Sequence, residues 1–137
     1  MEGKTETFER IPIISKERLA FVDNLHKKES QERTNKSEAI LVSLIDEKSG
    51  RRLEYDLKET CTIGRHVKMC DIVLDYDRTV SSRQCKLHLS KGKVYVSDLG
   101  GTNSTYLNNH KINEPTKIQT GDVLGFGRMD LIIKINE

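Results

Sequence analysis

A recurrent alternation of apolar and polar residues from residue 39 onward constrains the fold of this chain most strongly. Successive side chains of a β-strand point to opposite faces, so a period of two is typical of strands with one buried face. No stretch after residue 39 keeps an apolar period of 3.6, and we therefore expect an all-β fold. The alternating apolar positions are Ile40, Val42 and Leu44, then Leu53, Tyr55 and Leu57, then Leu87, Leu89, Val94 and Val96, and finally Leu131, Ile133 and Ile135.

Short turn sequences separate these alternating stretches. Lys48-Ser49-Gly50 divides the first two stretches, and Ser90-Lys91-Gly92-Lys93 divides the next two, with glycine at the tight position of a hairpin. Short strands joined by turns of Gly, Asn and Asp favour an antiparallel β-sandwich.

The first 38 residues have a different texture. They carry 8 Lys or Arg and 8 Asp or Glu with few large apolar side chains, which favours a mostly disordered tail or linker. Within residues 16–28, Leu19, Val22 and Leu25 recur every three residues, so this stretch could form one short helix. We therefore expect a tail over residues 1–38 and a single domain over residues 39–137.

Composition excludes several classes of protein. The chain has 137 residues, with 23 Lys or Arg against 21 Asp or Glu, and this near balance does not predict wholesale binding to nucleic acid or membrane. The start of the chain has no apolar signal segment, and no apolar run is long enough to span a bilayer, so we expect an intracellular protein. Three cysteines without a C-x-x-C pair make a disulfide framework or a zinc site improbable, and we expect no metal or cofactor.

Two groups of loop residues carry chemistry suited to an anion. The first offers Arg65, Ser81 and Arg83, and the second offers Thr102 and Asn103 after a pair of glycines. A phosphate dianion is bound well by guanidinium forks, hydroxyls and backbone N–H groups, and an asparagine amide can pair with a peptide backbone. On the residues alone, the plainer interpretation is that the arginines are solvated and that the second group is an ordinary turn.

From about residue 39 to residue 137 the chain resembles a forkhead-associated (FHA) domain, a β-sandwich that binds phosphothreonine. The resemblance rests on an ordered set of motifs at family spacing. These are Gly64-Arg65, Asp71-Ile72-Val73-Leu74, Val80-Ser81-x-Arg83, Val94-x-Val96-x-Asp98-Leu99, Thr102-Asn103-x-Thr105-Tyr106-Leu107-Asn108, Ile112 and Gly121-Asp122-Val123-Leu124-x-Phe126-Gly127.

The resemblance implies a role for each loop residue. Arg65 would be the principal cation for the phosphate, Ser81 would donate its hydroxyl, and Arg83 would add positive charge. Thr102 would contact the phosphate from the opposite loop, while Asn103 would hold the ligand backbone. Family members often read the third residue after the phosphothreonine. Here Arg78 could favour an acidic residue at that position, whereas Asp75 and Asp77 would oppose one, and a solvated loop without such a role is the alternative.

Three positions depart from the family pattern. Gln84 replaces the usual histidine, which leaves the rigidity of the loops open, although its amide could substitute. Ser104 replaces the usual glycine after the asparagine, and Asn108-Asn109 replaces an Asn-Gly turn. None of these changes falls on Arg65, Ser81 or Asn103.

The sequence thus predicts a phosphothreonine-peptide-binding module and no enzyme, because no nucleophile lies near a base in a catalytic motif. The alternative is a phospho-independent interaction sandwich whose phosphate site has decayed. A basic strip that includes Lys68 and Lys86 gives little support for nucleic-acid binding, because Tyr76 is the only aromatic residue near it. The resemblance also suggests nuclear signalling, for example in DNA-damage or meiotic checkpoints. Phosphorylation of a tail threonine (Thr5, Thr7 or Thr34) could drive self-association.

Overall fold

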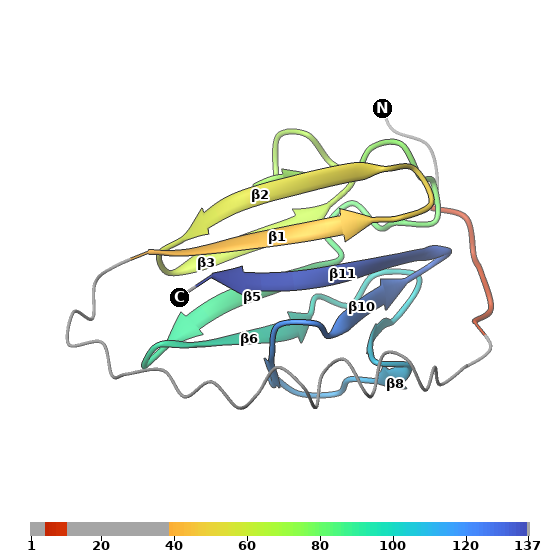
Figure 1. Ribbon diagram of the computed structural model, residues 1–137. Coiled ribbons are helices and arrows are strands. Elements are labelled where there is room, and N and C mark those ends of the chain that lie inside the picture. The colour runs from red at the N-terminus through yellow and green to blue at the C-terminus, as the bar shows by residue number, and fades with distance from the viewer. Residues whose placement is uncertain (1–4, 11–38, 137) are drawn as a thin grey trace.

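The computed structural model of the protein describes residues 5–10 and 39–136. The described part contains no helix and forms two β-sheets that face each other (Figure 1). One sheet has six strands in the order β2-β1-β11-β10-β7-β8, and the other has five in the order β4-β3-β5-β6-β9. The strands are β1 (Ile40–Asp46), β2 (Arg51–Leu57), β3 (Thr60–Gly64), β4 (Ile72–Val73), β5 (Cys85–Ser90), β6 (Lys93–Asp98), β7 (Thr105–Leu107), β8 (His110–Lys111), β9 (Thr116–Ile118), β10 (Val123–Phe126) and β11 (Met129–Asn136).

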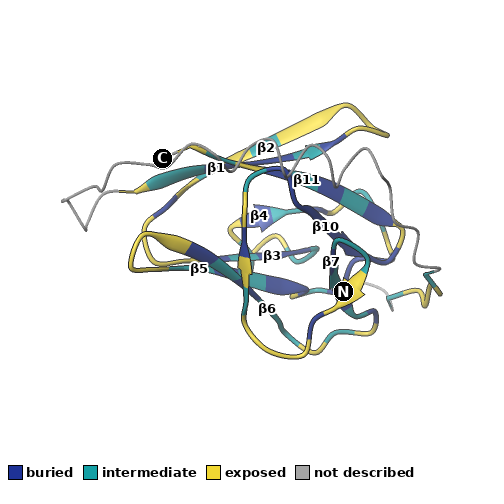
Figure 2. Ribbon diagram, turned by 60° about the horizontal axis from the view of Figure 1, so that its bottom comes forward, coloured by how far each residue is buried: buried dark blue, intermediate teal, exposed yellow. Residues whose placement is uncertain are grey.

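The predicted alternation places one face of each sheet in a shared core. In the six-stranded sheet, Leu44 pairs with Ile133 across β1 and β11, and both are fully buried. In the five-stranded sheet, Cys61 pairs with Leu87 across β3 and β5, and these are fully buried as well. Along β5, β6 and β11 buried residues alternate with less buried ones, as the colours of Figure 2 indicate, and apolar burial between the sheets holds them together.

The hairpin between β5 and β6 has the predicted turn. Ser90 ends one strand and Lys93 begins the next, while Lys91 and Gly92 have φ of 52° and 77°. Two successive residues with positive φ match the twist of the flanking strands and are typical of a type I′ hairpin turn. Lys91 accepts a backbone conformation that glycine adopts more readily, whereas the glycine falls where the sequence predicted it.

The all-β sandwich is confirmed. Among the strand pairs described, only β3 and β4 run parallel, and the others are antiparallel. The short helix expected within residues 16–28 lies outside the described residues, and the division into a tail (1–38) and a domain (39–137) stays a prediction. Within residues 5–10 and 39–136, no helix is long and apolar enough to cross a membrane.

One part of the tail lies against the domain. Residues 5–10 run along one end of the sandwich, where the red segment in Figure 1 passes the ends of the two sheets. Hydrogen bonds join the domain to Thr5, Glu6, Phe8 and Arg10 in this segment, with donors on both sides. This contact links residues about 60 to 120 positions apart, and the sequence pattern did not indicate it.

Candidate functional site

Three loops at one end of the sandwich carry the five predicted site residues. Arg65 directly follows β3, Ser81 and Arg83 lie between β4 and β5, and Thr102 and Asn103 lie between β6 and β7. Two backbone hydrogen bonds tie the first loop to the second, since the N–H groups of Arg65 and His66 donate to the carbonyls of Ser81 and Ser82. The sequence-predicted residues therefore come from loops that the fold brings together.

Ser81 connects the second loop to the third. Its side-chain oxygen accepts a hydrogen bond of 3.0 Å from the backbone N–H of Thr102, and the residue is 4% exposed. A Cβ atom on Gly101 would lie only 2.1 Å from the same oxygen, so the loops can approach this closely only with glycine there. The hydroxyl hydrogen of Ser81 remains able to donate to an anion at the loop surface.

The buried side chain of a glutamine forms hydrogen bonds to the same two loops. Gln84 is fully buried, and its side-chain oxygen accepts from the backbone N–H of Ser81 at 3.0 Å. Its Nε2 donates to the backbone carbonyl of Asn103 at 2.8 Å and to the Thr105 hydroxyl at 3.1 Å. The Gln84 amide thus joins the second and third loops, so these loops are tied together without the histidine that is usual at this position.

Asn103 holds an extended peptide segment, and that segment is the chain's own residues 5–10. Its Nδ2 donates to the carbonyl of Glu6 at 2.9 Å, while its Oδ1 accepts from the N–H of Phe8 at 3.0 Å. A further bond from Nδ2 to the carbonyl of Thr79, at 3.0 Å, anchors the amide itself. One side chain therefore pairs with two alternate backbone groups of the bound segment, which fixes the register of the segment on the loops.

This register places Thr5 beside Arg65. The guanidinium Nη2 donates to the Thr5 hydroxyl oxygen at 3.1 Å, and Nε donates to the carbonyl of Val80 at 2.9 Å. The second bond orients the guanidinium, so that the head group faces the threonine oxygen. A phosphate attached to that oxygen would lie next to a positioned cation.

The residue after Thr5 is acidic and faces two arginines. The Glu6 carboxylate lies 4.0 Å from Arg78 Nε and 3.8 Å from an Nη2 atom of Arg128. The Glu6 backbone N–H also donates to the carbonyl of Arg78 at 3.1 Å. All three side chains are at least half exposed, so these ion pairs contribute little to stability by themselves.

Arg83 and Thr102 lie on the same loops but are exposed. Neither is among the residues that hold the docked segment through the hydrogen bonds described above. Both side chains therefore lie at the surface of these loops.

Two contributors were missed at the sequence level. Arg128 lies in the turn between β10 and β11 and also approaches Asp77 at 3.7 Å. Thr79 ties that turn to the site, because its hydroxyl oxygen accepts from the Arg128 N–H at 2.9 Å. In the sequence, Arg128 can be recognised only as a basic residue in a turn between two strands. The residues that it approaches, Glu6 and Asp77, lie far from it along the chain, so the sequence pattern does not reveal its place in the site.

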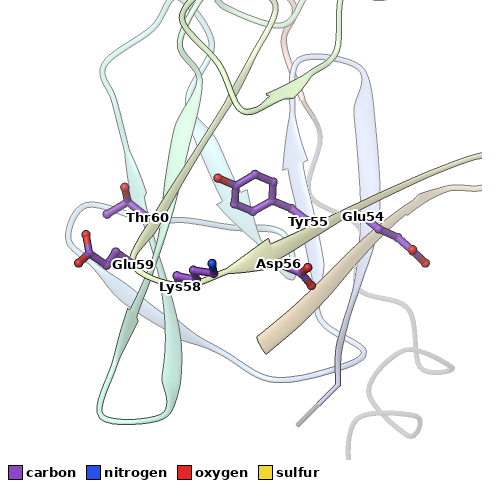
Figure 3. A pocket seen from close by; sticks show the side chains of 6 residues that line it. All are labelled: Glu54, Tyr55, Asp56, Lys58, Glu59 and Thr60. Carbon is purple, nitrogen blue, oxygen red and sulfur yellow. The ribbon is translucent and has the colours of Figure 1, made fainter. Parts of the chain in front are cut away.

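A pocket lies away from these loops and contains none of the predicted residues. Its lining comes from β2 and from the turn into β3 (Figure 3): Glu54, Tyr55, Asp56, Lys58, Glu59 and Thr60. Within the described ranges, no group of three or more His, Cys, Asp or Glu side chains is placed to hold a metal ion.

Comparison with known proteins identifies relatives of this chain. Residues 61–127 match the family model described as the FHA domain. An oxoglutarate dehydrogenase inhibitor of Corynebacterium efficiens is 37% identical over 94 residues, which cover 69% of this chain and 63% of that protein. The glycogen accumulation regulator GarA of Mycolicibacterium smegmatis is 34% identical over 94 residues, which cover 69% of this chain and 57% of that protein. The match therefore spans less than two thirds of the length of either relative.

The fold is shared with solved structures as well. A chain from a structural and functional analysis of phosphothreonine-dependent FHA domain interactions superposes with a TM-score of 0.61 and 25% identity, over 72% of this chain and 98% of the other. The family matched is one of binding modules. The nuclear checkpoint setting gains no support, because the relatives named above are bacterial regulators.

Proposed function

Because this chain carries a forkhead-associated domain, we propose that it binds partner proteins that are phosphorylated on threonine. The phosphothreonine side chain would lie at Arg65, with the ligand backbone extended across Asn103. Arg65, Ser81, Arg83 and Thr102 together would supply the cations and donors that a phosphate dianion requires.

The observation that carries this proposal is the register of the docked segment. Asn103 binds the carbonyl of the first residue after Thr5 and the N–H of the third, while Arg65 binds the hydroxyl oxygen of Thr5. An oxygen that would carry the phosphate thus lies against the principal cation while the following backbone is paired. This arrangement suits a threonine ligand in extended conformation better than a nucleotide or a helical peptide.

We also propose that residues 5–10 compete with external ligands for the site. The docked Thr5 makes a neutral hydrogen bond to Arg65, whereas a phosphate group would make charge-assisted bonds to the same guanidinium. An external phosphopeptide can therefore displace the unmodified segment. Phosphorylation of Thr5 itself would strengthen the internal contact, or allow the segment to bind a neighbouring copy.

The alternative is a sandwich that binds extended peptides without phosphate. The docking of an unmodified segment favours it, because the backbone pairing at Asn103 needs no phosphate. In the first proposal, the phosphate of an external ligand binds Arg65, Ser81, Arg83 and Thr102. In the alternative, an external ligand binds without a phosphate at these residues.

A titration of the full chain with labelled peptides separates the two. The peptides share the sequence Thr-Glu-Thr-Phe-Glu-Arg, and their first residue is phosphothreonine, phosphoserine or unmodified threonine. Fluorescence anisotropy should show the phosphothreonine peptide binding at least about 30-fold more tightly than the unmodified one, the scale for a desolvated charge pair. Equal affinities for all three peptides would support the phospho-independent alternative.

A further inference from the structure

A socket for a guanidinium group lies at the turn between β10 and β11, outside the loops that carry Arg65, Ser81 and Thr102. Arg10 fills it: Nη1 donates to the carbonyls of Gly127 at 2.6 Å and Met129 at 3.3 Å, and Nη2 donates to Oδ1 of Asp130 at 2.5 Å. Its Cζ also lies 5.3 Å from the centroid of the Tyr106 ring. The Arg10 side chain is only 12% exposed, far less than the arginines around Glu6.

The socket is built by three neighbouring strands. Gly125 of β10 pairs with Tyr106 of β7 on one side and with Asp130 of β11 on the other, so the three residues form one row across the sheet. The neighbours of Gly125 in β10, Leu124 and Phe126, are core residues, and the row therefore faces away from the core. Tyr106, Gly125, which has no side chain, and Asp130 therefore lie side by side on this face of the sheet.

The guanidinium of Arg10 occupies the space that a side chain at position 125 would fill. A Cβ atom on Gly125 would lie 2.6 Å from Nη2 of Arg10 and 2.9 Å from Oδ1 of Asp130. Gly125 has no positive φ, so its backbone does not require glycine. Glycine at position 125 therefore matters because it leaves space for the guanidinium, and not because of its backbone conformation.

The distance along the segment is fixed as well. The hydrogen bonds of Asn103 fix the positions of Glu6 and Phe8, and the bond from Arg65 fixes the position of Thr5. Arg10, the fifth residue after Thr5, then lies in the socket. We propose that the socket is a specificity site that selects arginine at the fifth position after the phosphothreonine, in external ligands and in the chain's own segment. The inference rests on the proposed function for the position of the phosphothreonine.

The geometry favours arginine over lysine. Two carbonyls, one carboxylate and one ring face surround a planar fork, whose donors point in fixed directions and whose face can stack on an aromatic ring. A lysine ammonium is a point charge and cannot satisfy both nitrogen positions at once.

The first test uses the full unmodified chain and does not depend on phosphate. Amide hydrogen exchange of residues 5–10 is compared among wild type, Arg10→Lys, Gly125→Ala and the control Arg52→Lys, which changes an exposed arginine paired with Glu54. We expect Arg10→Lys and Gly125→Ala to speed exchange of the segment by about tenfold, the scale for losing charge-assisted bonds, while the control does not. Unchanged exchange of strands β5 and β6 shows that each variant is folded. Unchanged exchange of the segment in both variants would overturn the socket.

The second test measures selection in external ligands. The full chain carrying Arg10→Ala, whose socket is vacant, is titrated with the phosphothreonine peptide bearing arginine, lysine or alanine at the fifth position after the mark. The peptide with arginine should bind about tenfold more tightly than the peptide with alanine, and Asp130→Asn should reduce that ratio to below about threefold. Equal affinity of the three peptides would show that the socket selects nothing. If no phosphopeptide binds, the proposed function is wrong, and the exchange result alone decides on the socket.

Discussion

The side-chain amide of Gln84 donates a 2.8 Å hydrogen bond to the backbone carbonyl of Asn103, the residue that holds the docked segment. The two are 19 residues apart in sequence and both are buried. A buried amide that is fully paired stabilises the loop and fixes the position of the asparagine side chain at the same time. The geometry of the site therefore depends on a residue that does not touch the ligand.

Replacing Gln84 by leucine should destabilise the domain and loosen the site together. The change keeps the approximate volume but leaves the Ser81 N–H and the Asn103 carbonyl without their partners. Buried unpaired groups of this kind cost about 1–3 kcal/mol each, so for these two groups we expect urea unfolding to show a loss of about 2–6 kcal/mol. Arg83→Gln is the matched control, because it changes an exposed position of the same loop and leaves both of these hydrogen bonds in place. A stability equal to wild type in the leucine variant would contradict the role given to this amide.

Removing the amide of Asn103 should release residues 5–10. Asn103→Ala deletes the bonds to Glu6 and Phe8 and also the bond to the carbonyl of Thr79, while Asn103 is not part of the apolar core. Amide exchange at Phe8 should rise at least about tenfold, since its N–H loses a buried acceptor. Thr102→Ala, on the neighbouring exposed position, should leave exchange at Phe8 unchanged. Protection that persists in the Asn103 variant would place the segment elsewhere.

Interrupting the segment should improve the binding of external phosphopeptides. Phe8→Pro removes the N–H that donates to Asn103, whereas Phe8→Ala keeps it. If the segment occupies the site in solution, the proline variant should bind an external phosphothreonine peptide several-fold more tightly than the alanine variant, as measured by anisotropy. Equal affinities would mean that the segment does not compete.

The buried thiols predict how stability changes at alkaline pH. Burial raises the pKa of the Cys61 thiol from 9.0 to about 12, with Asp71 as the next cause, and burial also raises the pKa of Cys85. The unfolded chain therefore loses these protons near pH 9 while the folded chain retains them, so the free energy of unfolding should fall as the pH rises from about 9 toward 12. Urea unfolding between pH 8 and about 10.5 measures this slope. Cys61→Ala should flatten it, and an equally steep slope in that variant would exclude Cys61 as a source.

Much of the fold could be predicted from the sequence because the strands are amphipathic. Val42 and Leu44 alternate with polar residues, and the Lys91-Gly92 turn has a local signature, so both follow from neighbours in the chain. The site loops could be located by their residue types and by the family resemblance.

The docking of residues 5–10 could not be predicted, because it depends on which surfaces the folded strands place side by side. Arg10 meets Asp130 across 120 residues, and the space at Gly125 appears only when three strands are paired. Arg128 joins the site for the same reason. No local period or turn signal encodes such contacts.

The coupling between the phosphate and Arg65 tests the central claim most directly. The affinities of the phosphothreonine peptide and its unmodified counterpart are measured for wild type, for Arg65→Ala and for the control Arg52→Ala, all as full chains. We predict that Arg65→Ala weakens the phosphopeptide by about 2–5 kcal/mol and the unmodified peptide by much less, because the lost partner is the cation for the phosphate. The control should bind both peptides as wild type does. Equal losses for the two peptides, or no loss for the phosphopeptide, would contradict the assignment of Arg65 as the residue that binds the phosphate.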